Sequence, residues 1–326
     1  MTKVSVIVPI YNVAPYIERC VRSLLGQTLT DVELIFVDDC SPDESMQILQ
    51  TVLAEYPERR AKVRVVRHVG NQGLPAARNT GLILAEGKYI FHFDSDDWAE
   101  NTLLERLYDA AEEADADFVW CDWYLAFPQN RRLMKQPSFE TPREALRGVL
   151  AGAMKYNVWN KLVRKELYTK NDILFPAGHG MGEDMTMVCL LACAKRVAYV
   201  SEALYNYAKR EGEAFTNGWS KQHQDDLFYN TDATIQFLKE RFGEEIEREA
   251  AWFQLNAKYS FLISKDYGLY RLWQQHYREA HAHIWTNSYS SFRCKLLQYA
   301  AAKHQYWILY LHYQLLYKFI YGVIYK

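Results

Sequence analysis

Three carboxylates stand within four residues of the stretch FHFDSDDW, at Asp94, Asp96 and Asp97. The preceding segment 89–93 is apolar, so a buried strand would deliver these acids to the protein surface. Carboxylates this close raise one another's pKa unless a cation or strong donors neutralise them. An oxygen-only ligand set suits Mg²⁺ or Mn²⁺, which usually keep coordination positions for substrate phosphates. The alternative is structural, with Asp97 capping the following helix.

A second pair of acids, Asp38 and Asp39, ends the apolar run VELIFVDD. The structural alternative is that these acids only end a strand and cap the next turn. The chain has no GxxxxGK[ST] loop and no GxGxxG after its first apolar run, which disfavours ordinary kinases, ATPases and dinucleotide-binding enzymes. If a divalent metal binds these acids in a chain that has no phosphate-binding loop, the metal itself would hold the diphosphate of a substrate.

The first 125 residues alternate between apolar strand patterns and amphipathic helix patterns. Strands are predicted at 4–10, 32–39, 62–68, 88–94 and 117–125. Helices are predicted at 14–26, 74–87 and 100–115, and another opens at Ser41 and Pro42. This alternation predicts an α/β fold with a mostly parallel sheet flanked by helices. Ligands bind outside the carboxyl ends of such strands, where the acids fall.

Composition narrows the class of protein and its compartment. The 326 residues carry a formal net charge of −2, so no global field favours nucleic acid as a partner. Six scattered cysteines form no CxxC pair, which is typical of a reducing cytosol. The N-terminal run MTKVSVIVPIYN lacks the longer apolar core of a signal peptide. We therefore expect a cytoplasmic protein.

Four motifs occur in order over residues 4–98: VSVIVPIYN, IFVDDCSPDES, GNQGLPAARNTGL and GKYIFHFDSDDW. Together they resemble the nucleotide-sugar domain of the family-two inverting glycosyltransferases of GT-A fold, of the bacterial surface-polysaccharide type. Two later stretches, VWNKLVRKELY and GEDMTMV, are similar to further motifs of bacterial members. The resemblance covers roughly residues 1–210 and carries no information beyond 220.

The resemblance implies roles for residues of the nucleotide half. The backbone after Pro9 and the ring of Tyr11 would hold uracil, the ring by stacking. Asp39 would accept a hydrogen bond from the base N3–H. Asp96 would bind Mn²⁺ or Mg²⁺, and Asp94 would contact either the metal or the ribose.

The resemblance also implies roles for two basic residues and an acid further along. Arg78 would either reach a phosphate or orient a carboxylate, the alternative being a partly exposed structural arginine. Lys161 would face the diphosphate or the acceptor, or else be a surface lysine. Asp184 would take the proton of the acceptor hydroxyl. Glu183 is its rival, and the alternative for Asp184 is a helix cap.

The same reasoning predicts the domain organisation. A GT-A catalytic domain would cover 1–218, with a nucleotide-binding half at about 1–125 and an acceptor half at about 126–218. A helix is expected from about 184 and a short strand near 197. A helical C-terminal region would cover 219–326, where strand patterns end.

The C-terminal stretch is aromatic and basic. After Glu279 the chain has no acidic residue, and HQYWILYLHYQLLYKFIYGVIYK ends it. The stretch is interrupted by His, Gln and Lys, which disfavours a transmembrane helix. Two interpretations of 290–326 stay open: an amphipathic segment on the inner leaflet of the membrane, or helices packed on the catalytic domain or in a homo-oligomer.

The preferred function is a metal-dependent inverting glycosyltransferase, of hexosyl or N-acetylhexosaminyl type. It would move a sugar from a UDP-sugar donor to the hydroxyl of a glycan or lipid-linked glycan acceptor during bacterial surface glycan synthesis. One alternative is a non-catalytic nucleotide-sugar-binding or scaffolding subunit. Another is a nucleotidyltransferase, which would usually need an early phosphate loop that the sequence lacks. The expected location is the cytoplasm, with peripheral contact to the inner face of the membrane left open.

Overall fold

Two compact units divide the chain, and each is described by itself. The computed structural model describes residues 2–209 and 219–315. The first unit comprises Met1–Ala145 and Tyr156–Gly212, and the second comprises Leu146–Lys155 and Glu213–Lys326. The first unit is built on a mixed sheet of order β3-β2-β1-β4-β8-β6-β9-β5, with β7 beside β6.

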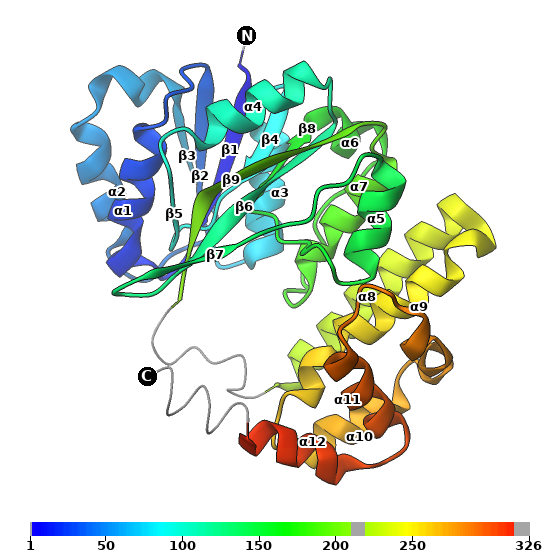
Figure 1. Cartoon of the computed structure of the whole chain (residues 1–326). Coiled ribbons are helices and arrows are strands. Elements are labelled where there is room, and N and C mark those ends of the chain that lie inside the picture. Colours follow the sequence, from blue (N-terminus) through cyan, green and yellow to red (C-terminus); the bar gives the residue numbers. More distant parts are fainter. Residues whose placement is uncertain (1, 210–218, 316–326) are drawn as a thin grey trace. The chain divides into compact units, whose positions relative to one another are not determined.

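The first half of the sheet is parallel, as the sequence predicts (Figure 1). Its strands are β1 (Val4–Ile10), β2 (Val32–Asp38), β3 (Val63–Arg67) and β4 (Tyr89–His92). β1, β2 and β4 are buried along their whole lengths, which explains their continuous apolar runs. Because these strands are parallel, their carboxyl ends lie at one edge of the sheet.

The second half of the sheet turns antiparallel at β4. Its strands are β5 (Trp98–Ala99), β6 (Phe118–Ala126), β7 (Arg131–Met134), β8 (Lys161–Arg164) and β9 (Val197–Ala208). β8 runs antiparallel to both β4 and β6, while β6 and β9 run parallel. The segment 117–125 therefore joins the parallel half only through β8, whose four residues are too few to show a strand period.

Helices flank this sheet, and α1 packs beside α2 (Figure 1). The helices are α1 (Ala14–Leu25), α2 (Ser45–Ala54), α3 (Leu74–Leu84), α4 (Leu103–Glu113), α6 (Lys165–Lys170) and α7 (Thr186–Cys193), with 3-10 turns at Pro57–Lys62 and Glu183–Met185. α5 (Pro142–Leu150) begins in the first unit and belongs to the second from Leu146 on. The expected helix start at Ser41 is wrong, since α2 begins at Ser45. The Ser41 N–H donates to Asp38 Oδ1 at 2.7 Å, which holds this segment in a turn.

Close packing of α3 on β1 depends on Gly81. A Cβ added at Gly81 would lie 2.3 Å from Cγ2 of Ile7, far inside van der Waals contact. Ile7 is fully buried in β1, so its side chain has no free space to enter. Glycine at this position thus lets α3 approach the sheet closely enough to bring its buried residues to the edge of β4.

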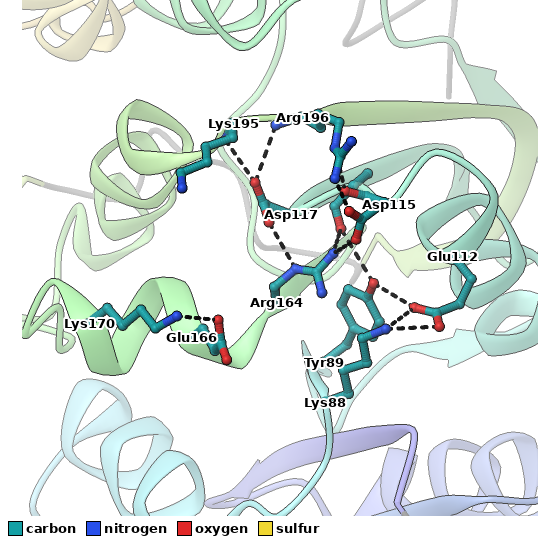
Figure 2. Close-up of polar contacts among 11 residues, drawn as sticks. Lys88, Tyr89, Glu112, Asp115, Asp117, Arg164, Glu166, Lys170, Lys195 and Arg196 are labelled. Carbon is teal, nitrogen blue, oxygen red and sulfur yellow. Dashed lines mark hydrogen bonds and ion pairs between the residues drawn. The ribbon is translucent and has the colours of Figure 1, made fainter.

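A network of ion pairs and hydrogen bonds joins the ends of β6, β8 and β9 at the opposite edge of the sheet (Figure 2). Arg164 donates from Nε to Asp117 at 2.8 Å and from Nη2 to Asp115 at 2.7 Å. Asp117 also accepts the backbone N–H of Lys195 at 2.8 Å. Beside this network the Tyr89 hydroxyl donates to Glu112 at 2.8 Å. These bonds link the ends of strands that are distant in sequence.

The second unit is helical in its described residues, as predicted for the region after 219. Its helices are α8 (Lys221–Phe242), α9 (Glu247–Ala257), α10 (Tyr267–Gln275), α11 (Phe292–Ala302) and α12 (Tyr306–His312), with 3-10 turns at Gly243–Ile246, Tyr259–Leu262 and Arg278–Thr286. Within 2–209 and 219–315, none of the helices combines the length and the apolar character that crossing a bilayer requires.

A buried lysine ties the core of the second unit together. Lys258 is fully buried, and its Nζ donates to the carbonyl oxygens of Trp273, at 2.9 Å, and of His276. The ammonium lies 4.3 Å from the centroid of the Trp273 ring. Burial lowers the pKa of Lys258 to about 7, although Glu279 opposes this. The carbonyl contacts connect α9 to α10 and fix the end of α10.

Candidate functional site

The carboxyl edge of the parallel strands gathers the predicted nucleotide-binding residues. Pro9 is buried in β1, and Tyr11 follows that strand with 48% of its surface exposed. Asp39 follows β2 and Asp94 lies two residues after β4. β1 pairs with both β2 and β4, so the three strand ends are neighbours. The Tyr11 ring is therefore exposed enough to contact a ligand, whereas the buried Pro9 could contact a ligand only through its backbone.

Asp39 is buried and held by donors from the loop before α3. Its Oδ1 accepts the Gln72 N–H at 2.8 Å, and its Oδ2 accepts the Gly73 N–H at 2.8 Å. His68 Nδ1 lies 2.7 Å from Oδ1, and its Nε2 lies 2.9 Å from the Thr80 hydroxyl. Gly73 has φ of 87°, a conformation that favours glycine. The carboxylate therefore organises the glycine loop, and Oδ2 keeps a lone pair for one further donor.

The loop after β1 is fixed by Asp43. Its Oδ2 accepts the Ala14 N–H at 2.8 Å, and its Oδ1 accepts the hydroxyls of Ser41 and Ser45 at 2.7 and 2.6 Å. Burial opposes ionisation, but these hydrogen bonds outweigh it and lower the pKa of Asp43 to about 2. Since Ser41 Oγ accepts the Asn12 N–H at 2.8 Å, the backbone beside Tyr11 is held by the loop after β2.

Arg78 is the centre of the acidic cluster. It lies on α3 with 1% of its surface exposed, so the partly exposed alternative is wrong. Its Nη2 donates to Asp94 Oδ1 at 3.0 Å, and its Nη1 donates to Asp184 Oδ1 at 2.9 Å and to Glu183 Oε1 at 3.4 Å. Burial lowers the pKa of Arg78, but the three carboxylates outweigh it and raise the pKa above its ordinary value.

The three carboxyl groups around Arg78 outnumber its single positive charge. Burial, and then the neighbouring Asp184, raise the pKa of Glu183 to about 8, against the opposing effect of Arg78. Burial also raises the pKa of Asp184, with Asp94 adding to it and Arg78 opposing it. The Asp184 side chain is 25% exposed and that of Glu183 is 14% exposed. A partly buried carboxylate cluster with excess negative charge favours a proton acceptor or a bound cation.

Lys161 joins the same site from β8. The residue is 1% exposed, so the surface alternative is wrong. Its Nζ donates to Asn160 Oδ1 at 2.7 Å. Burial lowers the pKa of Lys161 to about 7, while Asp184 opposes this, which places the two groups within electrostatic reach. A lysine with this pKa can hold or release a proton near neutral pH.

Asp97 holds the loop 93–97, which carries Asp94 and Asp96, against the sheet. It is fully buried, and its Oδ2 accepts the Tyr205 hydroxyl at 2.7 Å while its Oδ1 accepts the Ala208 N–H at 2.7 Å. The Tyr205 oxygen in turn accepts the Asp94 N–H at 3.3 Å. Asp97 therefore links the loop to β9, and the expectation that it caps the following helix is wrong, since Thr102 is the N-cap of α4.

The donor set fits a divalent cation that takes most of its ligands from a substrate. Among residues 2–209 and 219–315, no three His, Cys, Asp or Glu side chains are grouped to hold a metal by themselves. Asp96 is half-buried next to Asp94, and three carboxylates share the one guanidinium of Arg78. One or two carboxylates plus diphosphate oxygens are the usual protein environment of Mg²⁺.

Two residues that shape the site were missed by the sequence analysis. His68 follows β3, which pairs with β2, so the rule on parallel strand ends could have placed it beside Asp39. Tyr205 gave no such signal, because it lies 108 positions after Asp97 and reaches it only through the pairing of β9 in the sheet. A tyrosine in a strand pattern indicates only a half-buried surface.

Comparison with known proteins identifies the class. Residues 5–185 match the family model described as Glycosyl transferase family 2. Over 245 residues the chain is 35% identical to the protein named uncharacterized glycosyltransferase EpsJ from Bacillus subtilis, and the match covers 70% of each chain. The chain belongs to glycosyl transferase family 2, and the resemblance drawn from its motifs is confirmed.

Solved structures show the same fold at lower identity. Staphylococcus aureus TarS 1–349 in complex with UDP-GlcNAc matches with a TM-score of 0.61 and 22% identity, over 96% of this chain and 91% of that one. The mannosyltransferase PcManGT from Pyrobaculum calidifontis in complex with GDP-Man and Mn²⁺ matches with a TM-score of 0.54 and 16% identity, over 95% and 83%. These matches confirm the predicted GT-A-type fold.

Proposed function

We propose that this glycosyltransferase moves a hexosyl or N-acetylhexosaminyl group from a UDP-sugar to an acceptor hydroxyl, with inversion at the anomeric carbon. The observation that carries the proposal is the cluster of Asp94, Glu183 and Asp184 on the buried Arg78. It combines an excess of negative charge, suited to a cation, with the raised pKa of Glu183 and Asp184, suited to proton transfer.

The donor nucleotide would lie across the ends of β1 and β2. The exposed Tyr11 ring offers a stacking surface, and Oδ2 of Asp39 keeps a lone pair for the N3–H of uracil. The TarS structure with UDP-GlcNAc supports this choice of donor. The PcManGT complex with GDP-Man makes guanine the competitor to exclude.

Asp96 and Asp94 would hold Mn²⁺ or Mg²⁺ at the diphosphate. When bound, the ion supplies positive charge that stabilises the leaving diphosphate. The Mn²⁺ in the PcManGT structure supports a divalent ion in this fold. Tyr205 and Asp97 would keep the loop in place, and Arg78 would orient Asp94 through the hydrogen bond from its Nη2 at 3.0 Å.

Asp184 would act as the general base. The acceptor oxygen attacks the anomeric carbon, its bond to that carbon forms as the bond to the diphosphate oxygen breaks, and the hydroxyl proton passes to a carboxylate oxygen of Asp184. The larger exposure of Asp184 supports it over Glu183, and Arg78 orients it at 2.9 Å. Lys161 would stabilise negative charge on the same side of the site.

The acceptor would be a glycan or a lipid-linked glycan of the bacterial surface. A relative that is 34% identical over 227 residues is named poly(ribitol-phosphate) beta-N-acetylglucosaminyltransferase TarS. A lipid-linked acceptor would draw the enzyme from the cytoplasm to the inner face of the membrane. The catalytic function would then reside in residues 1–218, and 219–326 would serve membrane association or oligomerisation.

A donor screen tests this proposal. UDP release would be measured for UDP-glucose, UDP-galactose and UDP-GlcNAc, with GDP-mannose as the mismatched donor, in Mn²⁺, in Mg²⁺ and in EDTA. We expect release from one UDP-sugar, its loss in EDTA, and its loss in Asp96→Ala. Equal turnover in EDTA would contradict metal dependence, and turnover of GDP-mannose alone would contradict the uracil site.

A further inference from the structure

The second unit exposes large apolar side chains on one stretch of its surface. Trp285 is 47% exposed, and Phe292, Leu296 and Tyr299 of α11 are 71%, 42% and 41% exposed. The Trp285 ring lies 6.1 Å from that of Phe292 and 5.7 Å from that of Tyr299, so these side chains are contiguous. We call this surface, with Arg293, Lys295 and Lys303, the aromatic-basic face.

The sequence of α11 is apolar on two sides. Leu297, Ala300 and Ala301 are buried and pack the helix onto its unit. Phe292, Leu296, Tyr299 and Lys303 recur at spacings of four, three and four residues, which places them on one other stripe of the helix. A single exposed aromatic needs no explanation, but a contiguous set indicates an interaction surface.

The segment that carries this face has charged residues of one sign. From residue 280 to the end, the chain has no aspartate or glutamate. Within the described residues, none of the side chains of Arg293, Lys295 and Lys303 forms an ion pair. The Lys303 Nζ instead lies 5.8 Å from the centroid of the Tyr299 ring. These cations are available to an external anion beside an apolar surface.

A second stripe follows on α12 and the π-helical turn after it. Trp307 and Leu311 of α12 and Leu315 of that turn are 61%, 48% and 57% exposed and lie four residues apart. No described helix is long and apolar enough to span a bilayer. Tryptophan and tyrosine favour the interface between headgroups and acyl chains, and basic residues favour anionic lipid. This combination is suited to lying on a membrane surface.

We propose that the aromatic-basic face docks on an anionic phospholipid surface, with its rings at headgroup depth and its cations on lipid phosphates. Charge complementarity selects this partner. A second copy related by two-fold symmetry would bring the same patch against itself, and Arg293, Lys295 and Lys303 would then face like charges. This proposal does not depend on the donor or the acceptor of the transferase reaction.

Co-sedimentation of the full chain with lipid vesicles tests the proposal. We expect binding to vesicles of phosphatidylglycerol and phosphatidylcholine, weak binding to pure phosphatidylcholine, and loss of binding at high salt. The triple variant R293Q, K295Q and K303Q should lower the partition coefficient about 100-fold, since each basic residue contributes roughly fivefold. The double variant Phe292→Ser and Leu296→Ser should lower it at least about tenfold at low salt, where the unmodified chain binds.

Matched controls separate this face from the general surface. The triple variant K221Q, K239Q and R241Q removes the same charge from α8 of the same unit. The double variant Ile83→Ser and Leu174→Ser removes exposed aliphatic side chains, 75% and 56% exposed, from the other unit. Both controls should bind vesicles as the unmodified chain does, and circular dichroism should show that all variants fold.

Three outcomes would overturn the proposal. One is equal partition of the face variants and the controls. Another is equal binding to neutral and anionic vesicles. The third is a dimer in sedimentation velocity that Phe292→Ser and Leu296→Ser dissociate without changing vesicle binding, which would assign the face to a second copy.

Discussion

Arg78 and Asp184 are 106 positions apart in sequence, yet Nη1 of the arginine donates to Oδ1 of the aspartate at 2.9 Å. The same guanidinium donates from Nη2 to Asp94 at 3.0 Å. One buried side chain on α3 thus connects the loop after β4 to the turn before α7. It sets the distance between the proposed metal-binding loop and the proposed base.

Arg78→Gln should remove this connection. We expect it to lower the free energy of unfolding by about 2–4 kcal/mol, because three partly buried carboxylates lose their counter-charge. UDP release should fall by at least about 100-fold, since the positioning of both acids is lost. Urea unfolding and UDP-release kinetics measure the two effects.

Arg164→Gln is the matched control for Arg78→Gln. Arg164 also bonds two aspartates, Asp117 and Asp115, but at the opposite edge of the sheet (Figure 2). Its loss should cost stability and leave the KM for the donor unchanged. Equal loss of UDP release in the two folded variants would mean that Arg78 acts only through stability.

Tyr205→Phe should weaken metal-dependent donor binding. The variant loses the hydroxyl that donates to Asp97 and accepts the Asp94 N–H. We expect UDP affinity in Mn²⁺ to fall about tenfold, with a larger effect on KM than on kcat, and stability to fall by about 1–3 kcal/mol. Titration calorimetry of UDP binding with and without Mn²⁺ measures the affinity.

Tyr89→Phe provides the comparison for Tyr205→Phe. The Tyr89 hydroxyl also donates to a carboxylate, that of Glu112, at 2.8 Å, away from the site. This variant should bind UDP as the unmodified chain does. A similar loss of UDP affinity in both variants would argue against a specific role for Tyr205.

The contribution of Glu183 to the stability of the ligand-free protein should fall as pH rises from about 5 to about 8. The pKa of Glu183 is about 8 in the folded protein, against 4.5 for an unperturbed glutamate. The folded state therefore binds the proton more tightly, and its stabilising effect is lost as pH passes the folded pKa. In EDTA, Glu183→Gln should reduce this fall by about 2 kcal/mol or more. An identical pH profile for both proteins would contradict the raised pKa.

Gly81→Ala should destabilise the first unit through its contact with Ile7. The added Cβ would lie 2.3 Å from Ile7 Cγ2, so we expect a cost of about 1–3 kcal/mol. Ile7→Ala alone also costs stability, but combined with Gly81→Ala it should remove the overlap. A double-mutant cycle by urea unfolding should therefore show a favourable coupling energy, whereas strict additivity would show that α3 shifts freely.

The parallel half of the fold followed from the sequence because its signals are local. The runs at 4–10 and 32–39 are apolar throughout, and doubly buried strands leave that pattern. The acids Asp39 and Asp94 could be assigned to one edge because parallel strands end together. The four-residue strand β8 and its antiparallel pairing left no comparable pattern.

The internal geometry of the site could not be predicted from the sequence. Arg78 was recognised as a candidate, but its burial and its three acidic partners depend on α3 meeting a turn 105 positions later. The buried state of Lys161 likewise depends on β8. Asp97 stood in the sequence as an acid that could cap the following helix, and its actual partners, Tyr205 and Ala208, lie on β9, which pairs across the sheet.

The structure describes only part of the C-terminal stretch 290–326. Of the expected segment 290–326, residues 316–326 lie outside the described residues. Residues 290–315 contain α11 and α12, whose exposed stripes agree with an amphipathic segment. Whether this segment binds a membrane or packs in an oligomer is the question that the vesicle experiment addresses.

Asp184→Asn tests the central claim most directly. The variant keeps the shape of the side chain and loses its ability to take the acceptor proton. With the donor identified by UDP release, and with an acceptor at hand, UDP binding should stay within about twofold while sugar transfer falls by about 1,000-fold or more. Glu183→Gln, assayed in parallel, should retain transfer within about tenfold. Full transfer by Asp184→Asn, with loss in Glu183→Gln, would contradict the assignment and move the base to Glu183.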